Sequence, residues 1–349
     1  MREDHRICVL STGACTAVGL SAASSAAAVR AGLARFLEHP TFLDQLEEPA
    51  IVAHPPASQP DLSLEERLVE FAIAAFADAI ESIPNAADFG PLPMVIALPE
   101  PRPGLDRQLG ERIVSRLSEN LRGFGVLSAM MLGHASGGAA IRHVSQMLDS
   151  GHWRWAAVVG LDSWLAADTV RWLEQNRQLH ASYNAWGFIP GEAAGVLLIS
   201  NLSTAREHKT RPRALIEAVA LDREEVPIKT DGVCLGWGLT RAVKAALSAL
   251  PENQQVDMIY CDQNGESYRA DEFGFMLARM GQRFRAPADF IAPADCWGDT
   301  GAATIPLLVT LATQAAERAY AIGTLSMILA GSESGHRAAI LLRTPTASN

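Results

Sequence analysis

Apolar runs of strand length alternate with runs of helix length along this 349-residue chain. In the second half the segments follow the order of a βαβαβαββ unit. Such alternation predicts an α/β fold in which a mostly parallel sheet is covered by helices. Its predicted strands are 214–220, 258–261, 325–330 and 338–342, and its predicted helices are 236–250, 270–280 and 301–316.

The first half carries a less regular version of the same pattern, so we expect an internal duplication. We divide the chain into an N-terminal half, 1–205, and a C-terminal half, 206–349. The first half contains a polar connection at 41–62 and ends in a linker-like stretch, 201–213. Its predicted strands are 6–12, 93–97, 155–160 and 196–200, and its predicted helices are 17–33, 63–83, 106–121 and 164–178.

Composition excludes several classes of function. Apolar residues make up 48% of the chain and charged residues 19%, as in a globular protein. The net charge of −10 argues against a nucleic-acid partner and mildly against an acidic carrier protein, although a local basic patch would still serve one. The apolar stretch 305–330 is interrupted by charged and polar residues, so we expect no membrane span. The polar N-terminus is no signal peptide, and a cytoplasmic protein is predicted.

The cysteines are scattered and form no CxxC pair, so neither a disulfide framework nor a zinc site is predicted. We expect reduced, mostly buried thiols. They are Cys8, Cys15, Cys234, Cys261 and Cys296.

An elbow at 131–141 (MLGHASGGAAI) is the most informative stretch. An apolar run enters a turn of small residues, and a helix continues to about Leu148. Such a turn directs one side chain toward the positive end of the helix, where a thiol would become a nucleophile. Here the side chain belongs to His134. Because positive charge is disfavoured at that end, we expect a neutral imidazole.

Several motifs resemble those of the β-ketoacyl synthases of the thiolase superfamily, over nearly the whole chain. The block 187–195 (GFIPGEAAG) is the most specific match. The opening segment 7–19 (ICVLSTGACTAVG) is similar to the family's entry strand and turn. By spacing, 259–272, 298–303 and 331–339 resemble its two histidine blocks and its glycine-rich closing turn. The resemblance implies a five-layered αβαβα fold with mixed sheets and two similar halves.

The family's chemical positions all carry other residues here. Its nucleophilic cysteine position falls on His134, and its two histidine positions fall on Asp262 and Asp299. A usual lysine position falls on Ala294, and an aromatic gate falls on Glu333. By position, His134, Asp262 and Asp299 are therefore the candidate catalytic residues, and Glu333, Ser332 and Ser136 are candidates for substrate binding.

Each candidate also has a plainer explanation. His134 would fill the cysteine's volume and bond to a nearby carboxylate, and Asp299 would cap the following helix. Ser136 would bond to backbone. If the side chains at 134, 262, 299 and 333 share one pocket, the carboxylates require a protonated partner, a charged His134 or a metal. Cys261 and Cys296 lie beside altered positions, and buried packing is the expected role of both.

We interpret the chain as a 3-oxoacyl-acyl-carrier-protein synthase homologue of fatty acid or polyketide biosynthesis that lacks standard Claisen condensation. The resemblance implies a homodimer, or a heterodimer with a synthase-like subunit, and an acyl carrier protein as a further partner. Such a pseudoenzyme would act as a partner subunit or bind an acyl ligand. The alternatives are acid–base or metal-assisted chemistry at His134, Asp262 and Asp299, and a purely structural assembly component. No cofactor is predicted.

Overall fold

The computed structural model describes residues 5–56, 62–84, 86, 90, 92–121, 124–228, 230 and 232–345. Within these residues the strands form a ten-stranded mixed sheet and a separate two-stranded hairpin. The hairpin consists of β2 (Leu37–Leu43) and β3 (Pro49–Val52). The large sheet contains β1 (Ile7–Cys15), β4 (Leu92–Leu98), β5 (Phe124–Met131), β6 (Trp155–Ser163), β7 (Glu192–Asn201), β8 (Ala214–Arg223), β9 (Met258–Cys261), β10 (Phe290–Ile291), β11 (Leu325–Gly331) and β12 (His336–Arg343).

The strand order repeats. One half of the sheet runs β1-β7-β6-β4-β5 and the other runs β8-β12-β11-β9-β10. In both, the first two pairings are antiparallel and the last two are parallel. The halves join where β1 pairs with β8 through Cys8–Leu215 and Val9–Ala214. The sheet is therefore mixed, not mostly parallel as the alternation alone predicts, because the last strand of each unit returns antiparallel between two others.

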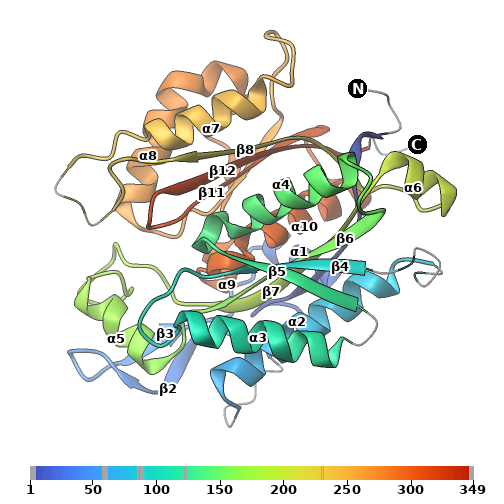
Figure 1. Ribbon diagram of the computed structural model, residues 1–349. Coiled ribbons are helices and arrows are strands. Elements are labelled where there is room, and N and C mark those ends of the chain that lie inside the picture. The colour runs from blue at the N-terminus through green and yellow to red at the C-terminus, as the bar shows by residue number, and fades with distance from the viewer. Residues whose placement is uncertain are drawn as a thin grey trace.

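Helices divide the molecule into five layers (Figure 1). Helices α2 and α3 cover one outer face, α7 and α8 cover the other, and α4 and α10 lie between the two halves of the sheet. This arrangement confirms the predicted five-layered fold. The helices are α1 (Ala22–Arg30), α2 (Leu64–Glu81), α3 (Arg107–Asn120), α4 (Ser136–Asp149), α5 (Ala167–Gln175), α6 (Leu202–Glu207), α7 (Trp237–Leu247), α8 (Ser267–Met280), α9 (Ala294–Trp297) and α10 (Thr304–Glu317), with 3-10 turns at Gly133–Ala135, Gly281–Arg283 and Gly301–Ala303.

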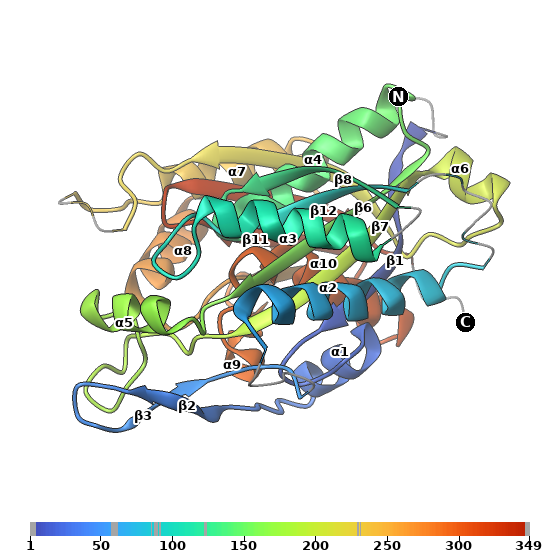
Figure 2. The ribbon, with the colours of Figure 1, turned by 60° about the horizontal axis from the view of Figure 1, so that its bottom comes forward.

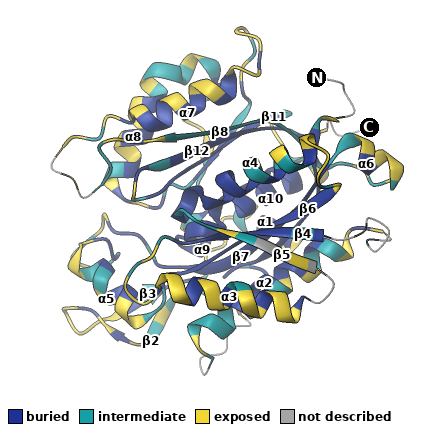
Figure 3. Cartoon of the chain, viewed as in Figure 1, coloured by how far each residue is buried: buried dark blue, intermediate teal, exposed yellow. Residues whose placement is uncertain are grey.

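Burial follows the layers. The outer helices bury one face and expose the other, whereas α10 is buried from Thr304 to Ala315 (Figure 3). A helix that is apolar all round has to lie in the centre of a large domain. The inner faces of both sheet halves pack on α4 and α10 in one core, and separate cores lie beneath α2–α3 and α7–α8.

Local capping explains where several elements begin. Ser63 caps α2 in a capping box with Glu66, as its sequence predicts. The first helix begins at Ala22 rather than at residue 17, because Thr16 and Gly19 close a turn and Ser21 is the cap. The predicted linker 201–213 contains α6, which Asn201 caps by accepting a hydrogen bond from Thr204 N at 2.9 Å.

Short elements account for the other differences. The predicted connection 41–62 includes the end of the β2–β3 hairpin, and its residues 57–61 lie outside the described part of the chain. The sequence gives no warning of β10 and α9, which span two and four residues. The hairpin and α5 lie together on the side of the molecule opposite both chain ends (Figure 2).

Two absences hold for what the structure describes. No helix there is long and apolar enough to cross a bilayer. All five cysteines are free, as predicted. The division of the chain at residues 205 and 206 stays a prediction, although the repeat of strand order agrees with it.

Candidate functional site

The elbow joins β5 to α4 through a 3-10 turn. Gly133 has φ +62°, a conformation that a side chain would strain. The small residues that follow allow close packing, because a Cβ at Gly137 would lie 2.8 Å from Ile305 Cβ and one at Gly138 would lie 2.6 Å from Ala338 Cβ. The elbow sequence therefore seats α4 tightly against α10 and β12, and His134 ends up only 3% exposed.

His134 meets Asp299 directly. Its Nε2 lies 2.8 Å from Asp299 Oδ1 and 3.0 Å from Oδ2, although the residues are 165 positions apart. The carboxylate also accepts hydrogen bonds from Trp164 Nε1 (3.0 Å), Asn264 Nδ2 (2.7 Å) and Gly301 N (2.8 Å). The expectation that the imidazole bonds to a nearby carboxylate is thus confirmed. Asp299 accepts from Gly301 N, but it does not cap the helix as expected, because the cap positions of the 3-10 turn and of α10 are Thr300 and Ala303 and neither has a side-chain cap.

The charge state of His134 corrects the sequence-based expectation. Burial lowers the pKa of His134, but the Asp299 carboxylate outweighs burial, and the net pKa lies above its ordinary value of 6.5. Burial likewise opposes ionisation of Asp299, yet His134 and the other donors hold the pKa of that carboxyl far below its usual range. Asp299 thus favours the charged imidazolium form of His134, and His134 in turn favours the ionised form of Asp299.

Asp262 lies near this pair but does not touch it. Its Oδ2 accepts hydrogen bonds from Arg269 Nη1 at 2.6 Å and from Gly331 N at 2.7 Å. Arg269 is 4% exposed and also donates to Glu266 at 3.2 Å and to the Gly331 carbonyl at 2.8 Å. The buried guanidinium of Arg269 therefore offsets part of the negative charge of Asp262 and Glu266, and burial raises the pKa of Glu266 toward its neutral form.

Glu333 is connected to the pair through a chain of side chains. Gln178 Nε2 donates to Glu333 Oε1 at 2.5 Å and to Glu266 Oε1 at 2.9 Å. Asn264 Nδ2 then joins Glu266 (3.1 Å) to Asp299 (2.7 Å). The structure thus brings His134 and Asp299 into contact, and it places Asp262 and Glu333 one or more residues further out.

Two serines hold the elbow from either side. Ser332 Oγ accepts from Ala135 N at 2.9 Å and donates to the Leu132 carbonyl. Ser136 Oγ donates to the Leu98 carbonyl at 2.7 Å and accepts from Leu132 N at 2.6 Å. The predicted backbone contact of Ser136 is confirmed, and the substrate-binding role of both serines stays a prediction.

Space beside the pair is small. A cavity lined by Cys261, Asp262, Trp297, Asp299 and neighbouring residues has a volume of about 10 Å³. That volume is room for about one water molecule. Burial raises the pKa of both adjacent thiols, Cys261 and Cys296, which therefore remain protonated, as expected for packing residues.

Trp164, Asn264 and Arg269 belong to the site, and the sequence reasoning missed all three. The indole of Trp164 donates to Asp299, and the guanidinium of Arg102 lies 3.7 Å from the centre of its ring. The only advance signal was position, since Asn264 and Arg269 lie within the block that resembles the first histidine motif.

Glu192, in the best-matching block, has a structural role. Its Oε2 accepts from Ser163 Oγ at 2.8 Å and pairs with Arg67 at 3.2 Å. It thus ties β7 to the end of β6 and to α2.

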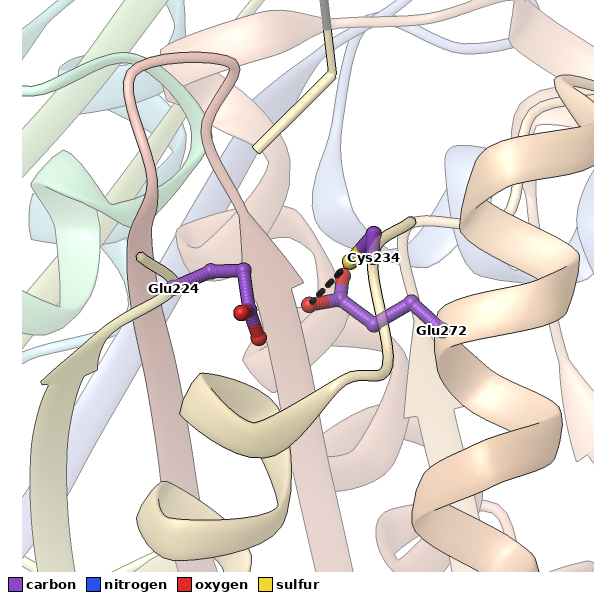
Figure 4. Close-up of side chains that lie close together, drawn as sticks. All are labelled: Glu224, Cys234 and Glu272. Carbon is purple, nitrogen blue, oxygen red and sulfur yellow. Dashed lines mark hydrogen bonds between the residues drawn. The ribbon is translucent and has the colours of Figure 1, made fainter. Parts of the chain in front are cut away.

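A second group of ligand-type side chains lies outside the site. The ligand atoms of Glu224, Cys234 and Glu272 lie within 4.8 Å of one another (Figure 4). Both carboxylates already have protein donors. Glu272 accepts from Arg337 Nε at 2.7 and 3.0 Å, and Glu224 accepts from Gly238 N at 2.7 Å. We therefore infer a structural role for both carboxylates. Glu272 anchors β12 through Arg337, and Glu224 anchors the start of α7 through Gly238 N.

Comparison with known proteins identifies the fold. No family model and no curated protein matches the sequence. Among solved structures, the ishigamide ketosynthase/chain length factor matches with a TM-score of 0.79 and 16% identity, over 97% of this chain and 99% of that one. A ketosynthase in complex with its chain length factor from Xenorhabdus doucetiae matches with a TM-score of 0.74 and 14% identity, over 97% and 98% of the two chains.

A further match is a type II polyketide ketosynthase in complex with its acyl-carrier protein. It has a TM-score of 0.76 and 13% identity, over 97% of this chain and 99% of that one. At such low identity the likeness speaks for the fold alone. The chain therefore has the thiolase-like fold of the ketosynthases along almost its entire length.

Proposed function

We propose that this chain is a ketosynthase-like partner subunit that performs no condensation itself and pairs with an active ketosynthase. The observation that carries the proposal is the buried ion pair of His134 and Asp299 at the elbow. Among the proteins with this fold, two are described as containing a ketosynthase and a chain length factor. A subunit without condensing activity that pairs with an active ketosynthase agrees with the His134–Asp299 pair and with these two structures.

The chemistry of the elbow supports this role. Acyl transfer through the protein requires a nucleophile with a free lone pair. An imidazolium has protons on both ring nitrogens and no such lone pair. Because Asp299 favours the charged form of His134, the side chain at the elbow is a poor acyl acceptor.

Acid–base or metal-assisted catalysis at the same residues has less support. Four donor groups already occupy the Asp299 oxygens, and Asp262 is held by Arg269 and Gly331 N. A general base needs an accessible acceptor, and a metal needs ligands without competing donors. The neighbouring cavity of about 10 Å³ also leaves no room for an organic substrate.

The edge of the sheet supports pairing with another subunit. Strand β5 is at the end of the strand order, so one side of its backbone lacks a neighbouring strand in the described sheet. Gly125 and Ala129 are exposed on it, and Met130 is half-buried. Exposed sheet edges readily pair with another chain, and small side chains permit close approach. A partner on this edge also agrees with the structural-assembly alternative.

Mass spectrometry tests the missing nucleophile. The intact protein is incubated with an acyl thioester of a carrier protein, beside the variant His134→Cys, which restores a thiol at the elbow. We expect the wild-type mass to remain unchanged. A stable acyl adduct on any wild-type residue would contradict the proposal, and an adduct on His134→Cys alone would support it.

Purification from native cells tests the partner. A tagged copy should retain a second ketosynthase-fold protein in equal amount, with a cysteine at its own elbow. Recovery of this chain with proteins of other folds only would favour the structural-assembly alternative.

A further inference from the structure

A cavity of about 210 Å³ lies away from the elbow, between α1, the strands β9 and β10, and the C-terminal half of α10. Most of its lining is apolar. The apolar side chains are Ala26, Val29, Met258, Ile291, Leu311, Ala315, Ala321 and Ile322. The lining shares no residue with the His134–Asp299 network, so the cavity is a separate feature of the fold.

Three polar side chains also line this cavity, those of Arg30, Tyr260 and Tyr320. Tyr260 lines it and is 6% exposed, yet its hydroxyl makes no hydrogen bond to any residue that the structure describes. The hydroxyl oxygen is not one of the fully buried side-chain atoms without a partner, so it is open to a molecule in the cavity. Burial raises the pKa of Tyr260 above its ordinary value of 10, so the hydroxyl keeps its proton and can donate it.

A cation lies at the mouth of the cavity. The Arg30 guanidinium is 4.1 Å from the ring centroid of Tyr320, and both residues line the cavity. Among the described residues Arg30 has no ion pair. Arg30 also lines an adjoining cavity of about 620 Å³ together with Arg318. Glu317, the residue before Arg318, is paired with Arg213 at 3.0 Å. Neither Arg30 nor Arg318 has an ion pair with a residue that the structure describes, although the chain has a net charge of −10.

We propose that this cavity binds a medium-chain carboxylic acid. The carboxylate accepts hydrogen bonds from Arg30 and from the Tyr260 hydroxyl, and the aliphatic tail packs against Leu311, Ile291 and their neighbours. On the measure by which about 10 Å³ holds one water, a volume of 210 Å³ holds on the order of 15 to 20 groups of water size, which is room for a carboxylate with a medium-length aliphatic tail. An apolar pocket with a few polar groups is the usual form of a small-molecule site.

Isothermal titration calorimetry with octanoate tests the proposal. We expect one site per chain, and roughly 10- to 100-fold weaker binding in Arg30→Gln, as for loss of a hydrogen bond to a charged group. Tyr260→Phe should weaken binding by roughly 3- to 10-fold. Arg30 is exposed, so Arg30→Gln should fold normally, and circular dichroism will verify this.

The controls separate the site from non-specific binding. Arg107→Gln removes an exposed arginine of α3 and should leave octanoate affinity unchanged. Octanol, which has the same tail without the charge, should bind more weakly than octanoate and equally well to wild type and Arg30→Gln. The proposal is overturned if octanoate does not bind at millimolar concentration, if Arg107→Gln weakens it as much as Arg30→Gln, or if octanol binds as tightly as octanoate.

Discussion

The starts of the two central helices can be compared directly. In the first half, Gly133 at φ +62° opens a 3-10 turn that leads into α4. In the second half, Gly301 at φ +48° opens an equivalent turn that leads into α10. The two turns are in contact. They differ in charge, because the first carries His134 and the second is preceded by Asp299.

This difference explains why the pair is stable. Two helix N-termini point toward one another, and each disfavours a positive charge. A carboxylate between them is favoured by both, and Asp299 accepts from Gly301 N at the start of α10. Once Asp299 is ionised there, an imidazolium on the opposite turn is favoured as well. One half supplies the anion and the other supplies the cation, so the site exists only when both halves are folded together.

The largest expected effect comes from removing the anion. Asp299→Ala leaves a buried cation without a partner and should lower the free energy of unfolding by about 3–5 kcal/mol. Urea denaturation measures it. Asp168→Ala, which removes an exposed carboxylate, is the matched control and should change stability by less than about 0.5 kcal/mol. Equal effects of the two substitutions would show that the buried pair has no special weight.

The next largest effect is the difference in stability cost between alanine substitutions at Gly301 and at Gly133. A Cβ at Gly301 would lie 1.9 Å from Asp162 Oδ2, whereas the closest atom to one at Gly133 is Ser332 Oγ at 3.2 Å. We expect Gly301→Ala to cost about 2–5 kcal/mol and Gly133→Ala about 1–2 kcal/mol, because only the first adds a clash to the backbone strain. If Gly133→Ala proved the more costly in denaturant titrations, the comparison of the two turns would be wrong.

The third effect concerns the hydrogen bond that Trp164 Nε1 donates to Asp299, because Trp164 lies in neither of the two turns. Trp164→Phe removes the hydrogen bond to Asp299 and should cost about 1.5–3 kcal/mol in thermal or chemical unfolding. Trp186 is 71% exposed, so Trp186→Phe is the matched control and should be nearly neutral. If Trp164→Phe left the free energy of unfolding unchanged, the hydrogen bond from the indole would not contribute to the stability of the pair.

The pH dependence is expected to be the smallest effect. The folded-state pKa of His134 lies above 6.5, so the stability that its charge contributes is complete below about pH 6.5 and is lost as pH rises through the folded pKa. The stability difference between wild type and His134→Asn should therefore shrink as pH rises above about 6.5 and through the folded-state pKa. Asp299 acts in the opposite sense, and its contribution is lost only in strong acid. A difference that grows toward alkaline pH would contradict the charged imidazole.

Some of this was predictable from the sequence for physical reasons. Periodicity and capping are local, so the alternation of strands and helices predicts the duplicated architecture, and Ser63 predicts the start of α2. The resemblance selects His134 and Asp299 because both stand in family motifs. The alternation alone does not predict the antiparallel return of β7 and β12, since strand direction depends on the completed sheet. The mixed sheets that the resemblance implies are confirmed.

The charge of His134 could not be predicted locally. The helix-end argument considers only α4, whereas the deciding carboxylate comes from the other half, 165 positions along the chain. Arg269 and Asn264 were missed for the same reason, because their roles depend on how α8 and the segment before it pack against β11. Asp262 lines the same small cavity as Asp299, but Arg269 and Gly331 N hold its carboxylate. Glu333 was expected in the same pocket and instead connects to the pair through other side chains, the first of which is Gln178.

The most direct test of the buried ion pair is ¹⁵N nuclear magnetic resonance of the His134 ring, assigned by comparison with His134→Asn. We predict that both ring nitrogens remain protonated well above pH 6.5, with Nε2 hydrogen-bonded to Asp299. A neutral ring that takes up a proton only below pH 6.5 would contradict the account, because a free imidazole at the elbow would again be available as a base or a nucleophile.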